Sequence, residues 1–171
     1  MKAWVAVVLV IFISLGGCVL LLTAVINNTP GDNRSRSDVS GPYARDIELY
    51  VNPIVPSNID FRERAAQAAK DCPSGDKTCH IHEVYRYVVE NYKYFADPKD
   101  QIVQAPNATV AVGGGDCEDL TILLNTLLEN LGIETYVVLT DTHAYSLACD
   151  VDPARLSTYA KEALLAQTAK D

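Results

Sequence analysis

The hydrophobic and polar positions divide the chain into an apolar N-terminal run, a polar connection and a longer region of mixed pattern. Residues 3–26 carry no charged side chain and are mostly Val, Leu, Ile and Ala. As a helix this run is about 36 Å long at about 1.5 Å per residue, enough to cross a bilayer core of about 30 Å. Residues 27–45 are rich in Asn, Ser, Asp, Gly and Pro, which predicts a flexible tether. We therefore expect a transmembrane anchor, a tether and one folded domain over residues 46–171.

Two alternatives to a retained anchor are a lipoprotein and a cleaved signal peptide. Residues 15–18 resemble a bacterial lipoprotein cleavage box, but residues 19–26 stay apolar where a lipoprotein turns polar. A cleaved signal has a shorter apolar core of about 7–15 residues. The short N-terminal flank with Lys2 favours a domain on the extracellular side, although Arg34 and Arg36 weaken this bias. The expectation is a single-pass membrane protein with its domain outside.

Within the domain, a run of leucines gives the clearest helical signal. Leucines recur at three- and four-residue spacing after Asp116, which predicts a buried core helix that begins there. Two apolar segments at 133–139 and 143–151 follow Gly132 and predict a β hairpin. The other expected elements are an extended segment at 47–55, helices at 58–70, about 80–92 and from 153 onward, and a loop at 96–115.

The charge balance excludes a nucleic-acid partner. The chain has 14 Lys and Arg against 22 Asp and Glu, which gives a net charge of −8. Phosphate contacts need a basic surface, so neither DNA nor RNA is expected to bind. The hydrophobic fraction of 49 % is too high for a disordered chain and agrees with a packed domain.

Two of the five cysteines bracket a short turn. A disulfide between Cys72 and Cys79 would close a small loop and fits an extracellular location. Two free thiols are an alternative. A zinc site with His80 and His82 is a further alternative, although the adjacent side chains of Cys79 and His80 diverge on a helix.

The turn before the leucine helix carries the candidate chemistry. Cys117 would lie in the first turn of that helix, where unpaired N–H groups and the positive helix end lower the pKa of a thiol. Negative charge on Asp116 and Glu118 opposes this effect. Strand alternation predicts that His143 and Leu147 share the face that packs on the Cys117 helix. A thiol beside an imidazole is the basic unit of thiol acyl transfer. A buried cysteine and a structural histidine are the plain alternative for either residue alone.

Five segments of the domain form a specific combination, in which Gly-Asp-Cys-Glu-Asp precedes the leucine helix and His-Ala begins the second strand. The segments are 92–97, 106–110, 115–121, 131–133 and 143–145. Together they resemble the transglutaminase-like domain of the papain-like cysteine-enzyme superfamily, and its microbial and archaeal membrane-anchored members in particular. The resemblance implies an α+β fold in which a cysteine-bearing helix packs on a short antiparallel sheet. It also implies that Cys117 is the nucleophile and His143 the general base and acid.

The sequence departs from this family at the third catalytic position. Relatives take an Asp from the strand after the His strand, and no such strand is evident here. Asp150 and Asp152 are about 23 and 30 Å from His143 along a straight strand at about 3.3 Å per residue, with the opposite parity. Asp141 has the right parity but lies on a turn. We therefore expect that no carboxylate orients the imidazole, and that the domain is shortened at its C-terminal end.

The resemblance also implies a metal candidate. Some secreted relatives that process surface adhesins bind calcium through acids that flank the cysteine, and Asp116 and Glu118 match those positions. Carboxylate oxygens suit Ca²⁺, but two acids do not make a site. The preference for negative charge at a helix N-terminus explains the same acids without a metal.

Two functions follow from these expectations. The first is a membrane-tethered cysteine protease, amide hydrolase or acyltransferase that acts on protein or peptide substrates through Cys117 and His143. Hydrolysis and cross-linking differ only in what attacks the acyl-enzyme, and the sequence does not distinguish them. The second function is a non-catalytic extracellular binding or structural module that retains the fold.

Overall fold

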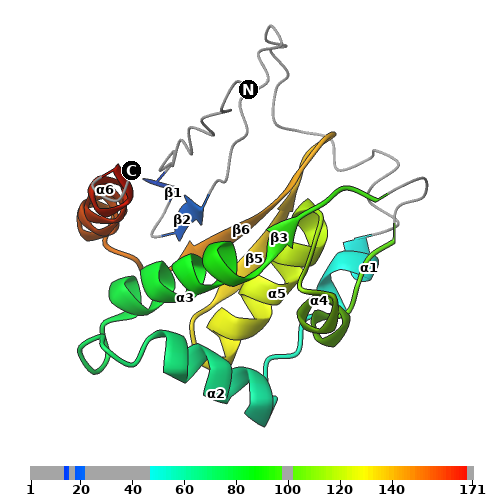
Figure 1. Cartoon of the computed structure of the whole chain (residues 1–171), viewed down its shortest axis with the longest axis horizontal. Coiled ribbons are helices and arrows are strands. Elements are labelled where there is room, and N and C mark those ends of the chain that lie inside the picture. The colour runs from blue at the N-terminus through cyan, green and yellow to red at the C-terminus, as the bar shows by residue number, and fades with distance from the viewer. Residues whose placement is uncertain (1–13, 16–17, 22–46, 98–101, 169–171) are drawn as a thin grey trace, which may run out of the picture.

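Helices and strands alternate irregularly along the chain and build an α+β fold (Figure 1). The computed structural model describes residues 14–15, 18–21, 47–97 and 102–168. The helices are α1 Ile47–Val51, α2 Ile59–Ala68, α3 Lys77–Asn91, α4 Pro106–Val112, α5 Cys117–Asn130 and α6 Pro153–Thr168. The strands are β1 Ser14–Leu15, β2 Cys18–Leu21, β3 Lys93–Tyr94, β4 Gly114–Gly115, β5 Thr135–Leu139 and β6 Ala144–Cys149. The α+β part of the expected fold class is confirmed.

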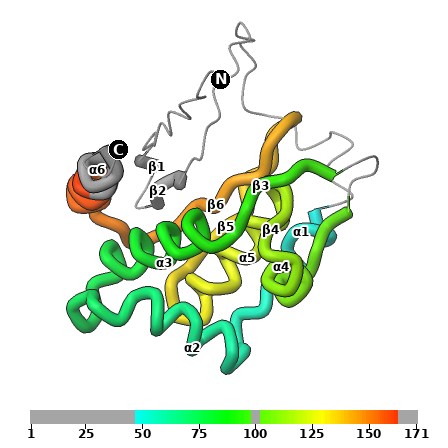
Figure 2. Tube along the Cα trace, in the orientation of Figure 1, coloured from blue at the N-terminus to red at the C-terminus, as the bar shows by residue number. Residues whose placement is uncertain are grey.

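The strands form two small sheets, and α5 lies at the centre of the domain. The larger sheet has the order β1-β2-β6-β5 with antiparallel neighbours, and β5 and β6 are the predicted hairpin. The smaller sheet pairs β3 and β4 in parallel. One side of α5 packs on β5 and β6, and the helix also contacts α2 and α3 (Figures 1 and 2). The helix therefore separates the larger sheet from these two helices.

The leucine pattern and the cap of α5 explain this central position. The Asp116 side chain accepts the backbone N–H of Asp119, and the Asp119 side chain accepts the backbone N–H of Asp116. This reciprocal capping box satisfies N–H groups that a helix start otherwise leaves unpaired. The helix buries its apolar side chains in one core with α2, α3 and β6, which includes Phe61, Ile81, Val84, Leu123, Leu127, Leu128 and Ala148. The predicted core helix is confirmed.

Two short strands lie within the apolar run that the sequence predicts to be a membrane helix. β2 pairs with β6, with Cys18 opposite Cys149, and β1 pairs with β2. Here the structure differs from the predicted helix, because a strand edge offers unpaired N–H and C=O groups that an extended segment can satisfy. The rest of the 3–26 run and the predicted tether lie outside the described residues. Among the residues that are described, no helix is both long and apolar enough to cross a membrane.

Two segments are helical where the sequence predicts extended chain or loop. α1 occupies part of the expected extended segment at 47–55, and α4 lies within the expected loop at 96–115. Pro106 begins α4, and its fixed φ suits a first helical turn, where its missing N–H needs no partner. Both helices contact α5. Helices this short are unstable alone, so packing against α5 stabilises them.

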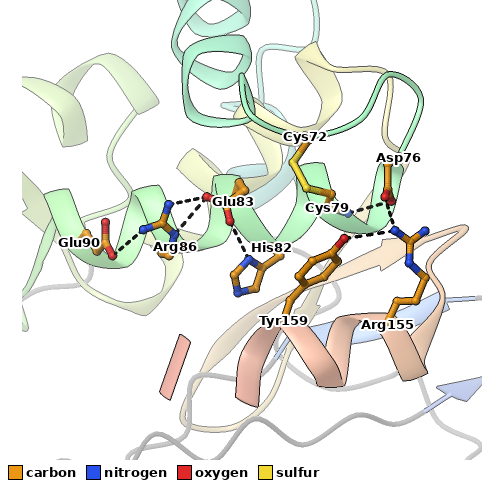
Figure 3. A network of polar contacts seen from close by, with 9 residues as sticks. All are labelled: Cys72, Asp76, Cys79, His82, Glu83, Arg86, Glu90, Arg155 and Tyr159. Atoms are coloured by element: carbon orange, nitrogen blue, oxygen red, sulfur yellow. Dashed lines mark hydrogen bonds and ion pairs between the residues drawn. A yellow bond between two sulfur atoms is a disulfide. The ribbon is translucent and has the colours of Figure 1, made fainter. Parts of the chain in front are cut away.

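The predicted disulfide joins Cys72 to Cys79, with their Cα atoms 5.7 Å apart. Within the loop that it closes, Asp76 caps α3 by accepting the backbone N–H of Cys79 at 3.1 Å. The same carboxylate pairs with Arg155 of α6, which also donates to Tyr159 (Figure 3). The disulfide prediction is confirmed, and the loop links the start of α3 to α6.

Candidate functional site

The candidate nucleophile lies where the small parallel sheet meets the start of α5. Tyr94 of β3 is the register partner of Gly115 of β4, and Cys117 follows two residues later. A Cβ atom on Gly114 would overlap the carbonyl oxygen of Lys93. Only glycine permits this close approach of two backbones. The glycine run therefore sets how near β3 lies to the thiol.

Asp119 fixes the first turn of α5 from inside the domain. Its fully buried carboxylate accepts the backbone N–H of Gln104 at 2.7 Å and also the side-chain amide of Gln104. It completes the capping box with Asp116 as well. A Cβ atom on Gly115 would overlap this carboxylate. The position of Cys117 is thus held by a buried hydrogen-bond network and by a glycine that makes room for it.

Asp116 and Glu118 are both buried and lie close to each other. The pKa of Asp116 is raised to about 7, and burial is the largest cause. The hydrogen bond and charge of Glu118 and the charge of Asp119 raise it further, whereas the backbone N–H of Asp119 lowers it. Adjacent carboxylates disfavour each other's charged form. Burial and the neighbouring acids therefore favour the protonated form of Asp116.

These two acids do not fit the calcium site that the family resemblance implies. Ca²⁺ takes about six to eight oxygen ligands, whereas the carboxyl groups of Asp116 and Glu118 bond to each other, to the helix cap and to the thiol. In the described part of the chain, no group of three or more His, Cys, Asp or Glu side chains is placed to hold a metal ion. No step below uses calcium.

Cys117 is a free cysteine and is half-buried. Its thiol donates a hydrogen bond to the carboxylate of Glu118 at 3.1 Å. The pKa of the Cys117 thiol is raised to about 11, and burial is the largest cause. Glu118 and Asp116 also raise this pKa, whereas the N–H of Ala144 lowers it. The lowering expected from the helix N-terminus is outweighed, because burial and two acids act against the thiolate. The resting state at neutral pH is a protonated thiol.

The start of β6 reaches the thiol, but the predicted face of that strand is wrong. The backbone N–H of Ala144, the residue after His143, points toward the Cys117 sulfur. Ala144, Ser146 and Ala148 are alternate buried positions of β6, and Ala148 lies in the core that contains the leucines of α5. These side chains are small, and that allows a helix to lie close to the sheet. His143 has the opposite parity and precedes the strand, so contact of its imidazole with the sulfur stays a prediction.

A backbone carbonyl selects the tautomer of His143. The imidazole is half-buried, and its Nδ1 atom bonds to the carbonyl oxygen of Thr142. A carbonyl oxygen only accepts, so this contact favours the neutral tautomer that has its proton on Nδ1 and leaves Nε2 as an acceptor. Asp150 and Asp152, which the sequence analysis places too far from His143 along the strand, have other partners. Asp150 pairs with Lys77, and Asp152 caps α6.

Three residues near the thiol carry little sequence signal of their own. Gln104, which binds Asp119, lies in the expected loop. Burial raises the pKa of the Tyr94 and Tyr145 phenols, and a charge on Cys117 raises both further. Both tyrosines belong to segments that carry the family resemblance, and this membership is the signal that could have identified them.

An open cavity of about 390 Å³ lies at the opposite end of β6. Residues of the disulfide loop line it together with Asp150, Asp152 and Arg155. Cys117 approaches the first residue of β6, whereas Asp150 follows the last, so about 20 Å of strand separates the two regions. This polar cavity is not part of the candidate site.

Comparison with known families gives one match. A family model described as the transglutaminase-like superfamily matches residues 44–159. This range covers more than half of the chain and contains Cys117, His143 and both acids that flank the cysteine. No curated protein and no solved structure matches the chain.

Proposed function

The chain belongs to the transglutaminase-like superfamily, and we propose that its domain is a cysteine enzyme acting on amide carbonyls of protein or peptide substrates. Cys117 is the nucleophile and His143 the general base and acid. One observation carries this proposal: a free thiol at the start of a buried helix faces the N–H of Ala144, the immediate neighbour of His143. The two residue types needed for thiol acyl transfer thus come from segments that meet in space.

The proposed reaction starts from the protonated thiol. As the sulfur attacks the carbonyl carbon, its proton passes to Nε2 of His143 and the carbonyl π electrons move to the oxygen. The backbone N–H of Cys117, a first-turn group with no acceptor inside the helix, stabilises the oxyanion. His143 then protonates the leaving nitrogen, and the C–N bond breaks to leave a thioester. Attack by water releases an acid, and attack by an amine releases a cross-linked amide.

The carbonyl of Thr142 supports the assignment of His143 as a base. In the family an Asp orients the histidine, and no such role is assigned to an acid here. The bond from Nδ1 to this carbonyl holds the ring in the tautomer whose Nε2 can accept a proton. A neutral carbonyl stabilises the imidazolium less than a carboxylate, so we expect slower catalysis than in relatives with a full triad.

We also propose that the domain acts outside the cell and is tethered when the apolar run 3–26 forms a membrane helix in place of the pairing of β1 and β2 with β6. The uncharged length of that run supports the tether, and the Cys72–Cys79 disulfide supports an oxidising location. The full chain should stay with membranes during carbonate extraction, and protease added to intact cells should digest its domain. Release of the intact chain by carbonate would contradict the anchor.

One observation favours the alternative of a non-catalytic module. Glu118 accepts the thiol hydrogen, and the pKa of Cys117 is raised to about 11. A cysteine held in this way is a poor nucleophile unless a base removes its proton. Dependence of thiol reactivity on His143 therefore distinguishes the two functions.

The test measures alkylation of Cys117 in the full chain by a peptidyl acyloxymethyl ketone, which combines a peptide backbone with a thiol-reactive carbon. Mass spectrometry follows the labelled fraction with time. General base catalysis contributes about 100-fold or more, so His143→Ala should slow labelling by about that factor. His80→Ala, which removes an imidazole from α3, is the matched control and should label like the wild type. Equal rates for all three proteins would support the non-catalytic module.

A further inference from the structure

The outer edge of β3 has backbone groups that β4 does not use. The N–H of Lys93 donates to Gly113, and the N–H of Phe95 donates to Gly115, each at 3.0 Å. Alternate residues of a strand turn their N–H and C=O groups to opposite sides, so Tyr94 turns both of its groups away from β4. Within the described residues the small sheet contains β3 and β4 alone. No backbone hydrogen bond joins Tyr94 to another described residue.

The strand that carries this edge lies beside the turn of the candidate nucleophile. Tyr94 pairs in register with Gly115, two residues before Cys117. The pKa of the Tyr94 phenol is raised, mainly by burial and also by the charges of Cys117, Asp116 and Glu118. The Tyr94 ring therefore lies within electrostatic reach of the turn that carries Cys117. The side chains of Tyr94 and Phe95 are nevertheless 61 % and 41 % exposed. The strand beside the thiol turn therefore has an open outer edge, and two exposed aromatic side chains belong to this segment.

We propose that the acyl-donor polypeptide binds in extended conformation along the outer edge of β3. One substrate residue exchanges two hydrogen bonds with the N–H and C=O of Tyr94, as in an antiparallel pair. Main-chain bonds then give affinity, while the exposed aromatic side chains contact alternate substrate side chains. This inference rests on the proposed function, because it assigns a substrate class to the same thiol. The class is an unfolded or flexible segment of several residues, and small amides are excluded because they cannot form the strand.

The first experiment alters the probe and leaves the protein unchanged. The full chain is labelled with benzyloxycarbonyl-Val-Phe-Ala acyloxymethyl ketone and with each of its singly N-methylated analogues. Iodoacetamide, which has no peptide backbone, serves as the reference for thiol reactivity. Loss of one hydrogen bond corresponds to about three- to tenfold in rate, so one analogue should label Cys117 slower than the parent by that factor. Equal rates for the parent and all analogues would overturn the proposed pairing.

The second experiment removes the donor from the protein. Tyr94→Pro lacks both the ring and the N–H, whereas Tyr94→Ala lacks only the ring. Proline is tolerated on an edge strand when the missing N–H faces outward, so both variants should fold. The parent probe should label the Tyr94→Pro variant about three- to tenfold slower than the Tyr94→Ala variant, with iodoacetamide rates equal. If the Tyr94→Pro variant fails to fold, the N-methyl series on the wild type decides the matter.

Failure of this inference is distinguishable from failure of the proposed function. The ratio of parent to N-methyl rates reports strand pairing, whereas the effect of His143→Ala reports general base catalysis. If the parent probe labels faster than an N-methyl analogue but His143→Ala has no effect, the β3 binding edge is supported and the proposed enzyme is rejected. If His143→Ala slows labelling but the parent and N-methyl probes label at equal rates, the proposed enzyme is supported and the β3 binding edge is rejected.

Discussion

Replacement of Glu118 by glutamine should make Cys117 more reactive. The carboxylate of Glu118 accepts the thiol hydrogen, and its charge raises the pKa of Cys117. Glutamine keeps an oxygen that can accept the same hydrogen bond but removes the charge. The substitution therefore isolates the electrostatic effect of this acid on the thiol.

The size of the effect follows from the distance between the two side chains. The sulfur and the carboxylate oxygen are 3.1 Å apart, and unit charges at about 4 Å interact by about 4 kcal/mol at an effective dielectric constant of about 20. Because Cys117 is only half-buried, solvent screening reduces this to about 1.4–2.7 kcal/mol, which is about one to two pKa units. The pKa should fall from about 11 in the wild type to about 9–10.

The assay is the pH dependence of iodoacetamide alkylation at Cys117. A pKa lower by about one to two units increases the thiolate fraction at pH 8 by about 10- to 100-fold. A less basic thiolate is also less nucleophilic, by about threefold per unit, so the net gain is about three- to tenfold. Glu63→Gln at an exposed position of α2 is the control and should not change the rate. An alkylation rate at pH 8 that is unchanged or lower in Glu118→Gln would refute the reasoning.

Three further predictions concern stability. The double substitution Cys72→Ser and Cys79→Ser opens a loop of sequence separation 7 and should lower the free energy of unfolding by about 2.5 kcal/mol in urea titrations; a wild type that is equally stable with and without reductant would contradict this. Gly114→Ala places a Cβ atom on the carbonyl oxygen of Lys93 and should lower the free energy of unfolding by more than about 2 kcal/mol, so a change below about 1 kcal/mol would count against the tight β3–β4 contact. Asn125 is fully buried, and its side-chain amide has no hydrogen-bond partner among the described residues. Asn125→Leu should therefore raise the free energy of unfolding by about 1–2 kcal/mol, and a destabilised variant would indicate a partner for this amide.

Features set by local sequence could be predicted from the sequence. The leucine spacing and the Asp116 cap define α5, because helical periodicity and capping depend on residues within a few positions. The hairpin follows in the same way from two apolar segments and a short turn. The Cys72–Cys79 disulfide is also local, because the two residues bracket one turn.

Features that depend on packing could not be predicted. α4 has a proline at its first position and is stabilised by contact with α5, which a loop-like composition does not reveal. The face of β6 depends on which side chains permit close approach of a helix, and the small residues Ala144, Ser146 and Ala148 take that side. The pKa of Cys117 depends on its burial, whereas the sequence displays only the helix end and the acids.

A raised thiol pKa is compatible with the proposed catalysis and with the proposed extracellular location. In a compartment where Cys72 and Cys79 form a disulfide, a free thiolate is the species that oxidises, and susceptibility follows thiolate character and exposure. Burial and Glu118 keep Cys117 protonated, which protects it at rest. A substrate strand on β3 would bring a carbonyl carbon to the sulfur and allow the proton to leave as the S–C bond forms, with a more basic sulfur as the stronger nucleophile. In the proposed mechanism, the acid beside the thiol restrains unproductive reactions, while productive attack depends on the pairing of substrate with the edge of β3 and on His143 as the proton acceptor.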